Sequence, residues 1–248
     1  MKPARYRPGR PAVELEAAHV AVFTDLHLSP MRPAEVQAFA ASFGELPPRT
    51  EAVVILGDLF DAYVGPEDLA VGAIPRLWQE TAILGAAGIP TYLIRGNRDV
   101  LMTVADGRRV GIEVVDSVLL RTPAGERCLL THGDAFCLAD RPYQRLRRIL
   151  RQPLLRPLLR GLPLGIRRRL AARLRRHSTL EVARKPLDMM ALHRPTVAAE
   201  AGRHQASQVV LGHFHRESRE ELEGGVGLWI LPAWEPGRLP VDPLAPSA

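Results

Sequence analysis

Five short apolar runs, each followed at once by a polar turn, constrain this chain more than any other feature. The runs are rich in β-branched residues, which is typical of buried strands. They cover residues 20–23, 52–55, 91–94, 128–130 and 209–211. The turns that follow them read Thr24-Asp25-Leu26-His27, Leu56-Gly57-Asp58, Gly96-Asn97-Arg98-Asp99, Thr131-His132-Gly133-Asp134 and Gly212-His213-Phe214-His215. Because open α/β sheets hold ligands at the carboxyl ends of their strands, we expect the five turns to lie together.

The turns carry side chains that bind metal ions. Asp, His and Asn together suit a pair of divalent cations that activates water for hydrolysis. A lone Asp-x-His is more often an ordinary turn, but five such turns in order, each behind an apolar run, favour a shared site. Asp58 follows Gly57, which allows close backbone approach, and is the candidate for a carboxylate shared by both metals. The predicted ligands are Asp25, His27, Asp58, Asn97, His132, His213 and His215.

The remaining pattern predicts a layered sheet core with a helical cap. Residues 1–17 are rich in Pro and Arg and are expected to form a flexible arm. The core is predicted over residues 18–139 and 206–248, with the cap inserted at 140–205. Helices are expected at 33–44 and at 67–87, where Pro75 should break the second. Short strands are expected near 113–121 and 127–131 around a turn at 123–126, and a closing hairpin near 224–225.

The cap carries the positive charge of the chain. Between Arg141 and Arg194 there are 16 Arg and Lys against two acids, a net charge of +14, whereas the rest holds 17 basic and 25 acidic residues. Leu and Arg at helical spacing predict an amphipathic basic surface that suits anionic lipid headgroups. Pro153, Pro157 and Pro163 should divide it into short helices. A solvated basic face over an ordinary core is the alternative. Nucleic-acid binding is disfavoured, because Tyr143 is the only aromatic residue of the insert.

Bulk composition indicates the cellular compartment of the chain. Two cysteines without framework spacing favour a reducing compartment. The first residues contain no apolar signal region, and no stretch approaches the roughly 20 uncharged apolar residues of a membrane span. We expect a cytoplasmic protein, peripheral on the inner membrane, without an obligate protein partner.

The ordered motifs resemble the calcineurin-like metallophosphoesterase family, whose blocks read D-x-H, G-D, G-N-[HR]-[DE], an isolated H and G-H-x-H. The match spans about residues 20–216. The resemblance implies an α+β fold of αββα type, a β-sandwich flanked by helices, with two Mn²⁺ ions. It also implies that Asp25, His27, Asp58 and His215 hold one metal, and that Asp58, Asn97, His132 and His213 hold the other.

Arg98 indicates the leaving group. Many members of the family carry His after the Asn, which can protonate a poor leaving group. Arginine keeps its proton and binds phosphate oxygens through its planar fork. Arg98 therefore favours a diphosphate, whose leaving phosphate needs no proton, unless its role is only structural. The predicted catalytic residues are Asn97, Arg98 and His132.

Within the family, the Gly-Asn-Arg-Asp block and several cap residues resemble the UDP-2,3-diacylglucosamine diphosphatases of lipid A synthesis. The resemblance implies a cap that holds two acyl chains, with substrate contacts from Arg98, Asp140, Tyr143, Arg175, Ser178 and Lys185. The chain departs from that pattern at Val182, at Phe214 and in Leu231-Pro232-Ala233-Trp234-Glu235, where a histidine is missing.

The sequence thus predicts a Mn-dependent hydrolase that cleaves the UDP-linked lipid to UMP and 2,3-diacylglucosamine 1-phosphate. Two alternatives remain at this point. One is a related enzyme acting on another nucleotide diphosphate or phosphodiester, and the other is a non-catalytic binding module on the same scaffold.

Overall fold

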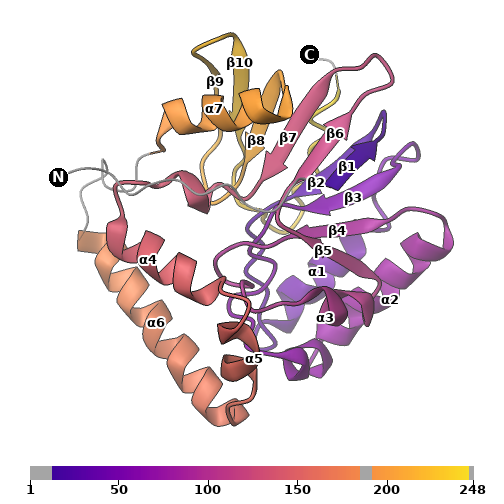
Figure 1. Ribbon diagram of the computed structural model, residues 1–248. Coiled ribbons are helices and arrows are strands. Elements are labelled where there is room, and N and C mark those ends of the chain that lie inside the picture. Colours follow the sequence, from indigo (N-terminus) through magenta and orange to yellow (C-terminus); the bar gives the residue numbers. More distant parts are fainter. Residues whose placement is uncertain (1–12, 185–191, 246–248) are drawn as a thin grey trace.

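Two β-sheets form the centre of the molecule (Figure 1). The computed structural model describes residues 13–184 and 192–245, with the side chains of 176–184 left out. The four-stranded sheet is entirely parallel, in the order β2-β3-β4-β5. Its strands are β2 (Val20–Phe23), β3 (Ala52–Ile55), β4 (Thr91–Ile94) and β5 (Ile112–Val115). Burial on both faces explains why the first three are continuous apolar runs.

The six-stranded sheet is mixed, in the order β1-β6-β7-β8-β10-β9. Parallel pairs join β1 to β6, β7 to β8 and β8 to β10, and antiparallel pairs join β6 to β7 and β9 to β10. The strands are β1 (Val13–Glu16), β6 (Val118–Arg121), β7 (Arg127–Thr131), β8 (Gln208–Leu211), β9 (Ser218–Leu222) and β10 (Val226–Ile230).

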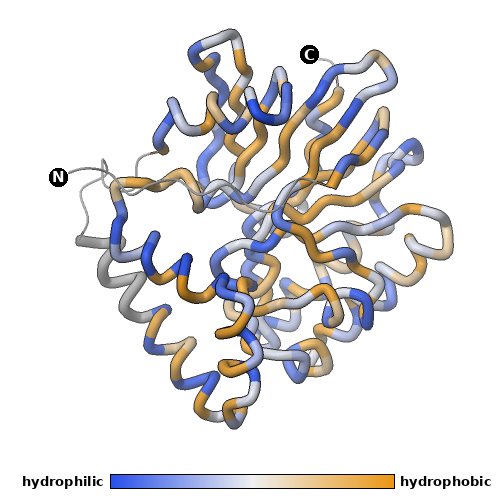
Figure 2. Tube along the Cα trace, in the orientation of Figure 1, coloured by the Kyte–Doolittle hydropathy of each residue, from blue (hydrophilic) through white to orange (hydrophobic). Residues whose placement is uncertain are grey.

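Alternate side chains of the strands fill three apolar layers. Val20 and Val22 point between the sheets, where they join Leu120, Leu130 and Val210 of the facing sheet. Ala21 and Phe23 point to the opposite face, which helices cover. In Figure 2 the central strands of both sheets are predominantly hydrophobic, whereas the edge strand β9 is polar. Successive side chains of a strand point to opposite faces, so a strand buried on both sides is apolar throughout.

Helices cover both outer faces of the sandwich. α1 (Pro33–Ser42) and α2 (Ile74–Ala86) pack on the four-stranded sheet, and α3 (Val104–Arg108) lies beside β5. The 3₁₀ turn η1 (Pro66–Ala70) precedes α2, and Pro75 lies in the first turn of α2, so the predicted segment is divided there. α7 (Arg194–His204) packs on the six-stranded sheet. The predicted αββα architecture is confirmed.

Between β7 and α7 the chain forms the cap, which lies beside the sandwich in Figure 1. It follows the 3₁₀ turn η2 (Asp134–Phe136) and consists of α4 (Arg141–Leu150), α5 (Leu155–Arg160) and α6 (Leu164–Arg184). Pro153 and Pro163 lie between these helices, and Pro157 lies in the first turn of α5. Among the described residues, no helix combines the length and apolar character needed to cross a bilayer.

Much of the positive charge of the cap is paired with acids of the core. Arg147 Nε lies 2.6 Å from Asp134, and Arg160 Nη2 lies 2.9 Å from Asp106. The pairs along the cap are Arg147–Asp134, Arg151–Asp116, Arg160–Asp106, Arg167–Glu67, Arg168–Asp68 and Arg175–Asp61. The cationic cap and the anionic core are therefore complementary, and these six arginines hold the cap in place.

Replacing Arg160 with alanine should lower the free energy of unfolding by about 3 kcal/mol near pH 7, because it leaves the buried Asp106 carboxylate without its cation. Burial raises the pKa of Asp106, but hydrogen bonds from Arg160 and Thr103 outweigh it and leave the pKa lowered. A lowered pKa stabilises the fold above the unfolded-state value near 4, and this contribution is lost as pH falls through the folded-state value. Urea unfolding of the unmodified chain and of the Arg160 variant should therefore show a difference in the free energy of unfolding that shrinks below about pH 4. An equal difference at pH 7 and pH 3 would contradict the pairing.

Three predicted boundaries differ from the structure. The expected arm over residues 1–17 is wrong for Val13–Glu16, which form the edge strand β1; Val13 and Leu15 pack inward and the two glutamates face outward. Residues 1–12 lie outside the described part. The predicted cap of 140–205 is too long, because α7 belongs to the core, where Val197 and Ala201 pack on the sheet. The single strand expected at 113–121 is two strands, β5 and β6, in different sheets.

Candidate metal centre

Both sheets deliver their polar turns to one edge of the sandwich. The four-stranded sheet supplies Asp25 and His27 after β2, Asp58 after β3 and Asn97 after β4. The six-stranded sheet supplies His132 after β7 and then His213 and His215 after β8. The turns after β2 and β3 continue to pair, since His27 N donates to Asp58 O at 2.9 Å. The seven predicted residues thus come from the carboxyl ends of five strands.

Five of these seven residues have a left-handed backbone, which is uncommon outside glycine. Their φ values are 52° at Asp25, 49° at His27, 53° at Asp58, 69° at His213 and 54° at His215. Asp, Asn and His tolerate this region better than other side chains, at a cost of order 1–3 kcal/mol each. The turns are therefore held in a strained shape that aims successive side chains at one point.

One group of potential ligands gathers around Asp25. Its Oδ1 lies 3.2 Å from Nε2 of His215, and Nε2 of His27 lies 3.2 Å from the same His215 atom. The ligand atoms of these three residues lie within 4.8 Å of one another. Burial lowers the pKa of His27 to about 4, so its ring is neutral and able to donate a lone pair near neutral pH.

A second group gathers around His132, whose Nε2 lies 3.6 Å from Asp58 Oδ1 and 3.2 Å from Asn97 Oδ1. On the other side of the ring, Nδ1 lies 2.9 Å from the carbonyl oxygen of Leu56. A proton on Nδ1 donates to that carbonyl, which leaves the lone pair of Nε2 for a metal. Asp25, Asp58 and His132 also have ligand atoms within 4.8 Å of one another. Asp25 therefore belongs to both groups.

Asp58 belongs to the second group and also faces a histidine of the first. One oxygen is 3.6 Å from His132 Nε2, and the other is 4.0 Å from His27 Nδ1. His213 is placed differently from the other predicted ligands: its ring lies 5.0 Å from the ring of His132, and its backbone N donates to Asp25 Oδ2 at 2.8 Å. Among the described residues, neither group includes a His213 nitrogen.

Buried negative charge makes this edge of the sandwich attractive to cations. Asp25, Asp58 and Asp99 are each at most 2% exposed. Burial raises the pKa of Asp58 to about 7, helped by Asp99 and Asp25 and opposed by His132. Burial lowers the pKa of His132, but Asp58 and the other carboxylates outweigh it and raise the pKa to about 9. In the described part of the chain, His27 Nδ1 is buried without a hydrogen-bond partner. Carboxylates, imidazoles and an unpartnered nitrogen together fit divalent cations.

Glycines in the motifs let the backbone touch the ligand residues. A Cβ on Gly57 would collide with the imidazole of His132, and one on Gly212 would collide with Thr24 and lie 2.7 Å from Asp25 Oδ2. A Cβ on Gly96 would strike the carboxylate of Asp58 and lie 2.5 Å from its backbone nitrogen. Each glycine therefore makes room for a ligand on a neighbouring turn.

Replacing Gly96 with alanine should weaken binding of a divalent metal by about 10- to 100-fold, because the methyl group displaces Asp58. Titration with Mn²⁺ followed by calorimetry would measure this. The control is Gly85 to alanine, where the new Cβ meets nothing within 4 Å in α2. The assignment would be wrong if both variants bound metal as the unmodified chain does.

Comparison with known proteins identifies the family of this chain. The family model described as calcineurin-like phosphoesterase matches residues 18–217. The chain belongs to the calcineurin-like phosphoesterase family. It is 36% identical over 220 residues to UDP-2,3-diacylglucosamine hydrolase of Edwardsiella ictaluri, covering 83% of this chain and 82% of that one. It is 33% identical over 214 residues to the protein of that name from Haemophilus ducreyi, covering 86% and 91%. A dimetal phosphatase structure from Danio rerio aligns with 14% identity and a TM-score of 0.45, covering 87% of each chain.

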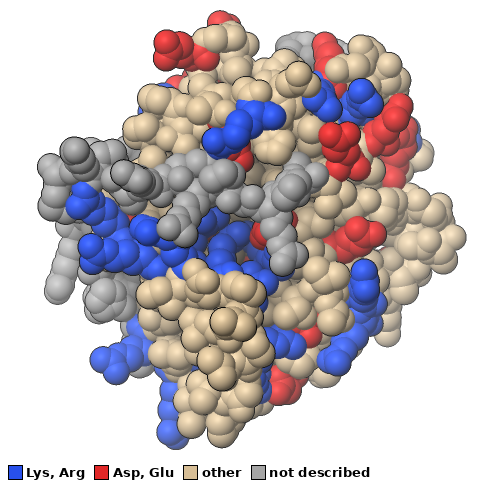
Figure 3. Space-filling model, in the orientation of Figure 1, with Lys and Arg blue, Asp and Glu red and all other residues tan. Residues whose placement is uncertain are grey.

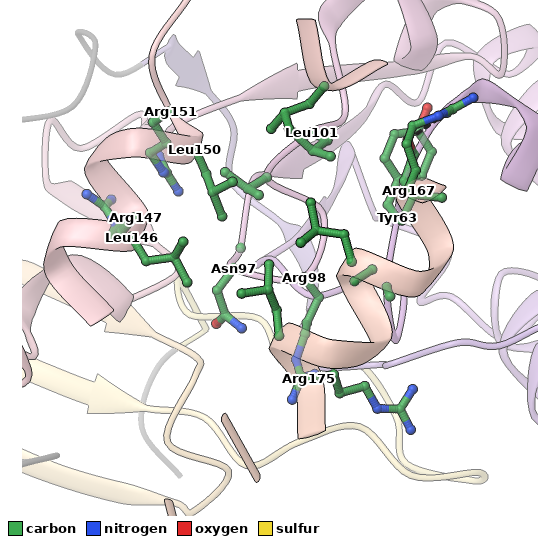
Figure 4. Close-up of a pocket in the computed structure, with 18 of the residues that line it drawn as sticks. Tyr63, Asn97, Arg98, Leu101, Leu146, Arg147, Leu150, Arg151, Arg167 and Arg175 are labelled. Carbon is green, nitrogen blue, oxygen red and sulfur yellow. Dashed lines mark hydrogen bonds between the residues drawn. The ribbon is translucent and has the colours of Figure 1, made fainter. Parts of the chain in front are cut away.

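Beside the family motifs lies a cavity between the cap and the core, shown in Figure 4. It contains about 1040 Å³ of empty space, part of it open to solvent. Leucines of the three cap helices and of the turn between α5 and α6 make up much of its lining: Leu146, Leu150, Leu159, Leu162, Leu170 and Leu174. Asn97 and Arg98 lie between α4 and α6 in this view, so the apolar cavity opens onto the turn that carries the predicted metal ligand Asn97.

Arg98 faces both the cavity and the metal ligands. Its backbone N donates to Asp58 Oδ1 at 2.9 Å, and its Nε lies 3.9 Å from Asp58 Oδ2. That Nε has no hydrogen-bond partner among the described residues, although it is buried. The guanidinium is thus available for an anionic group held between the metal site and the cavity.

The predicted substrate contacts in the cap fall into three classes. Tyr143 and Arg175 line the cavity, and Tyr143 OH donates to Asp134 at 2.6 Å while Arg175 pairs with Asp61. Asp140 is absent from the cavity lining; it caps α4 by accepting from Tyr143 N at 3.1 Å. The side chain of Ser178 and the whole of Lys185 lie outside the described part, as does the side chain of Val182.

The other departures from the subfamily pattern have structural roles. Phe214 packs edge-on against His213 and against the apolar layer under α7. Trp234 packs on Phe39 with ring centroids 5.2 Å apart, and its backbone N donates to Thr24 O at 2.9 Å. The C-terminal segment therefore supports the turn that carries Asp25, whereas Glu235 is exposed.

Sequence reasoning missed the role of Asp99. This residue is fully buried, and its two oxygens accept from Gly96 N at 2.7 Å and Leu59 N at 2.9 Å. It thereby ties the Asn97 turn to the Asp58 turn. The signal was present, because Asp99 ends the Gly96-Asn97-Arg98-Asp99 motif and a turn carboxylate commonly accepts from nearby backbone N–H groups.

Proposed function

We propose that this chain hydrolyses the diphosphate of UDP-2,3-diacylglucosamine, giving UMP and 2,3-diacylglucosamine 1-phosphate. One observation carries the proposal: a leucine-lined cavity opens directly onto Asn97 and Arg98, beside the candidate metal ligands. A substrate that joins acyl chains to a diphosphate needs this combination. The curated relatives named UDP-2,3-diacylglucosamine hydrolase support the same substrate.

In this proposal, Asp25, His27, Asp58 and His215 hold one Mn²⁺, and Asp58, Asn97, His132 and His213 hold another. When bound, two such cations supply Lewis acidity and lower the pKa of water toward neutrality. The buried carboxylates orient the imidazole ligands, and the Leu56 carbonyl fixes the tautomer of His132. Among the described residues, His213 lies outside both groups of close ligand atoms and near the ring of His132.

Arg98 and Asn97 act on the phosphoryl groups. The Arg98 guanidinium stays protonated and binds the oxygens of the leaving phosphate, which therefore needs no proton donor. The amide of Asn97, beside His132, lies where charge develops on the transferring group. These fixed donors stabilise the transition state without rearrangement.

The cavity selects and orients the lipid. Each CH₂ group that it buries contributes roughly 0.8 kcal/mol of binding. Leu146 and Leu150 extend from α4 toward Asn97 and Arg98 in Figure 4, so chains held there place the diphosphate at the metal edge. A soluble nucleotide would leave this surface in contact with water.

The test is UMP release from UDP-2,3-diacylglucosamine by purified protein supplied with Mn²⁺. We expect release that EDTA abolishes, and an efficiency at least about 1000-fold lower for a UDP-sugar without acyl chains, as the loss of many buried CH₂ groups requires. Comparable hydrolysis of the two substrates would overturn the lipid assignment and favour a soluble diphosphate. Metal binding without any hydrolysis would indicate a binding module.

We also propose that the cap carries the cytoplasmic enzyme to the inner membrane. Figure 3 shows an uncharged surface over the lower part of the cap, bordered by Lys and Arg. The cap exposes Ile149, Leu154, Leu158, Ile166 and Leu170, and Leu154 is 80% exposed. Exposed apolar side chains beside cations suit an anionic bilayer surface.

Replacing Leu154 and Leu158 with aspartate should reduce binding to vesicles that contain anionic lipid by about 10-fold or more, because each change removes apolar area and adds repulsion. Vesicle co-sedimentation would measure this. Hydrolysis of substrate dispersed in detergent should stay unchanged, since neither residue lines the cavity. Undiminished vesicle binding would place the membrane contact elsewhere.

A further inference from the structure

Arg147 of α4 and Arg151, which directly follows the last residue of that helix, contact the two turns that carry Asn97 and His132. Arg147 and Arg151 are four residues apart, so they lie on the same face of the helix. Arg147 Nε donates to Asp134 Oδ2 at 2.6 Å, two residues after His132. Arg151 Nη2 donates to the backbone oxygen of Arg95 at 3.0 Å, two residues before Asn97.

The first contact is reinforced by its neighbours on α4. Tyr143 OH donates to the same Asp134 oxygen at 2.6 Å, and the Gln144 side chain donates to the backbone oxygen of Asp134 at 2.8 Å. Asp134 is 2% exposed, so these bonds lie out of competition with water. Three side chains of α4 thus hold the start of η2 through both its carboxylate and its backbone.

The second contact belongs to a network on the other turn. Arg151 Nη1 lies 3.2 Å from Asp116 Oδ1, and the Arg95 side chain donates to the same oxygen at 2.8 Å and 3.0 Å. Arg95 is 4% exposed and directly precedes Gly96. Arg151 therefore binds both the backbone that leads into the Asn97 turn and Asp116, the carboxylate that holds the Arg95 side chain.

We propose that α4 is a clamp that sets the separation of the Asn97 and His132 turns, with Arg147 and Arg151 as positioning residues. The two turns come from different sheets, so no backbone ladder of a single sheet holds them in register. The clamp joins the two turns through side chains of the cap. It rests on the proposed function, in that Asn97 and His132 would serve one metal, and it links occupation of that site to the position of the cap.

The alternative is that the arginines only dock the cap, as Arg160 does. The two roles differ in what they change. A docking contact affects stability and the cavity, whereas a clamp also affects the metal held by Asn97 and His132. Contacts that orient metal ligands typically contribute about 10- to 100-fold in metal affinity.

The test compares Arg147→Ala combined with Arg151→Ala against two controls. Arg145→Ala removes an exposed arginine of the same helix, and Arg160→Ala removes a cap contact away from the metal turns. Calorimetric titration with Mn²⁺ measures the affinity of each equivalent of metal that binds. Turnover of bis(p-nitrophenyl) phosphate, which has no acyl chains, measures the rate of hydrolysis independently of lipid binding in the cavity.

We expect the double variant to bind one equivalent of Mn²⁺ about 10- to 100-fold more weakly, and the other within about twofold. Its kcat on the small substrate should fall at least about 10-fold, with both controls unchanged. Normal metal binding in the double variant, or the same loss in Arg160→Ala, would overturn the clamp. If the wild-type chain binds two Mn²⁺ but hydrolyses nothing, the proposed function fails while the titration still decides the clamp.

Circular dichroism would show whether the double variant folds. If it does not, Tyr143→Phe and Arg151→Lys take its place, since each removes part of one contact and keeps the side chain nearly intact. A weakened second equivalent in both supports the clamp, and two normal equivalents in both overturn it.

Discussion

Replacing Asp58 with alanine should lower kcat/KM for diphosphate hydrolysis by at least about 1000-fold. The carboxylate lies between the two groups of ligands, and its loss removes several kcal/mol of charge stabilisation in the transition state. Metal analysis of the purified variant should show fewer bound ions. UMP release measures the rate.

The metal-free Asp58 variant should be as stable as the unmodified chain at pH 8, or more stable. Burial and the neighbouring Asp99 and Asp25 raise the pKa of Asp58, which means that its ionised form opposes folding. The unmodified metal-free chain should therefore lose stability as pH rises from about 4 toward 7, whereas the variant should lose less. Replacing Asp242, which is distant from the candidate metal site, with alanine serves as the control for the change of stability with pH. A variant that keeps full activity would show that Asp58 is not a metal ligand.

The second large effect is expected at Arg98, where alanine should lower kcat/KM on the diphosphate by about 100- to 1000-fold. Its guanidinium faces the cavity beside the metal ligands and has an unpartnered Nε. Lysine should recover only part of the loss, because it keeps the charge without the planar fork. Steady-state kinetics of UMP release would measure both variants.

Substrate choice separates this role from a structural one. Bis(p-nitrophenyl) phosphate releases a stable phenolate, so Arg98→Ala should cost much less on it than on the diphosphate. An equal loss on both substrates would indicate that Arg98 acts through Asp58, to which its backbone N already donates, and not on the leaving phosphate.

The sequence predicted that five polar turns meet at one edge of the sandwich, because each turn is specified by local signals. A buried strand ending in Gly, Asp or His specifies both the strand and the direction of the next side chains, and five such units need only pack in parallel to converge. Even Asp99 lay within a recognised motif. The left-handed φ values at five ligands were not predicted, since they depend on pairing between neighbouring turns such as His27 with Asp58.

Features that depend on contacts distant in sequence were harder to predict. β1 was hidden in a Pro- and Arg-rich stretch, although Val13 and Leu15 alternate with glutamates. α7 directly follows the cap in the sequence, and its buried Val197 and Ala201 place it on the sheet. The split of β5 from β6 follows from a sheet change that no local pattern marks.

The charge of the cap predicted some of its contacts and not others. Its excess of arginine suggested a lipid surface, but six of these side chains pair with core acids. The opposite net charges of cap and core, +14 and −8 by residue count, already indicated that the two would attract each other. Which arginine meets which acid depends on the folded geometry.

The dependence of the cap on ion pairs makes ionic strength a control on access to the cavity. Counter-ions at about 1 M shrink the Debye length to about 3 Å, so the pairs Arg168–Asp68 and Arg175–Asp61, whose arginines are about half exposed, should weaken first. The buried contacts at Asp106 and Asp134 are less accessible to salt. Concentrated electrolyte should therefore loosen α6 while α4 stays seated, opening the hydrophobic chamber from one side.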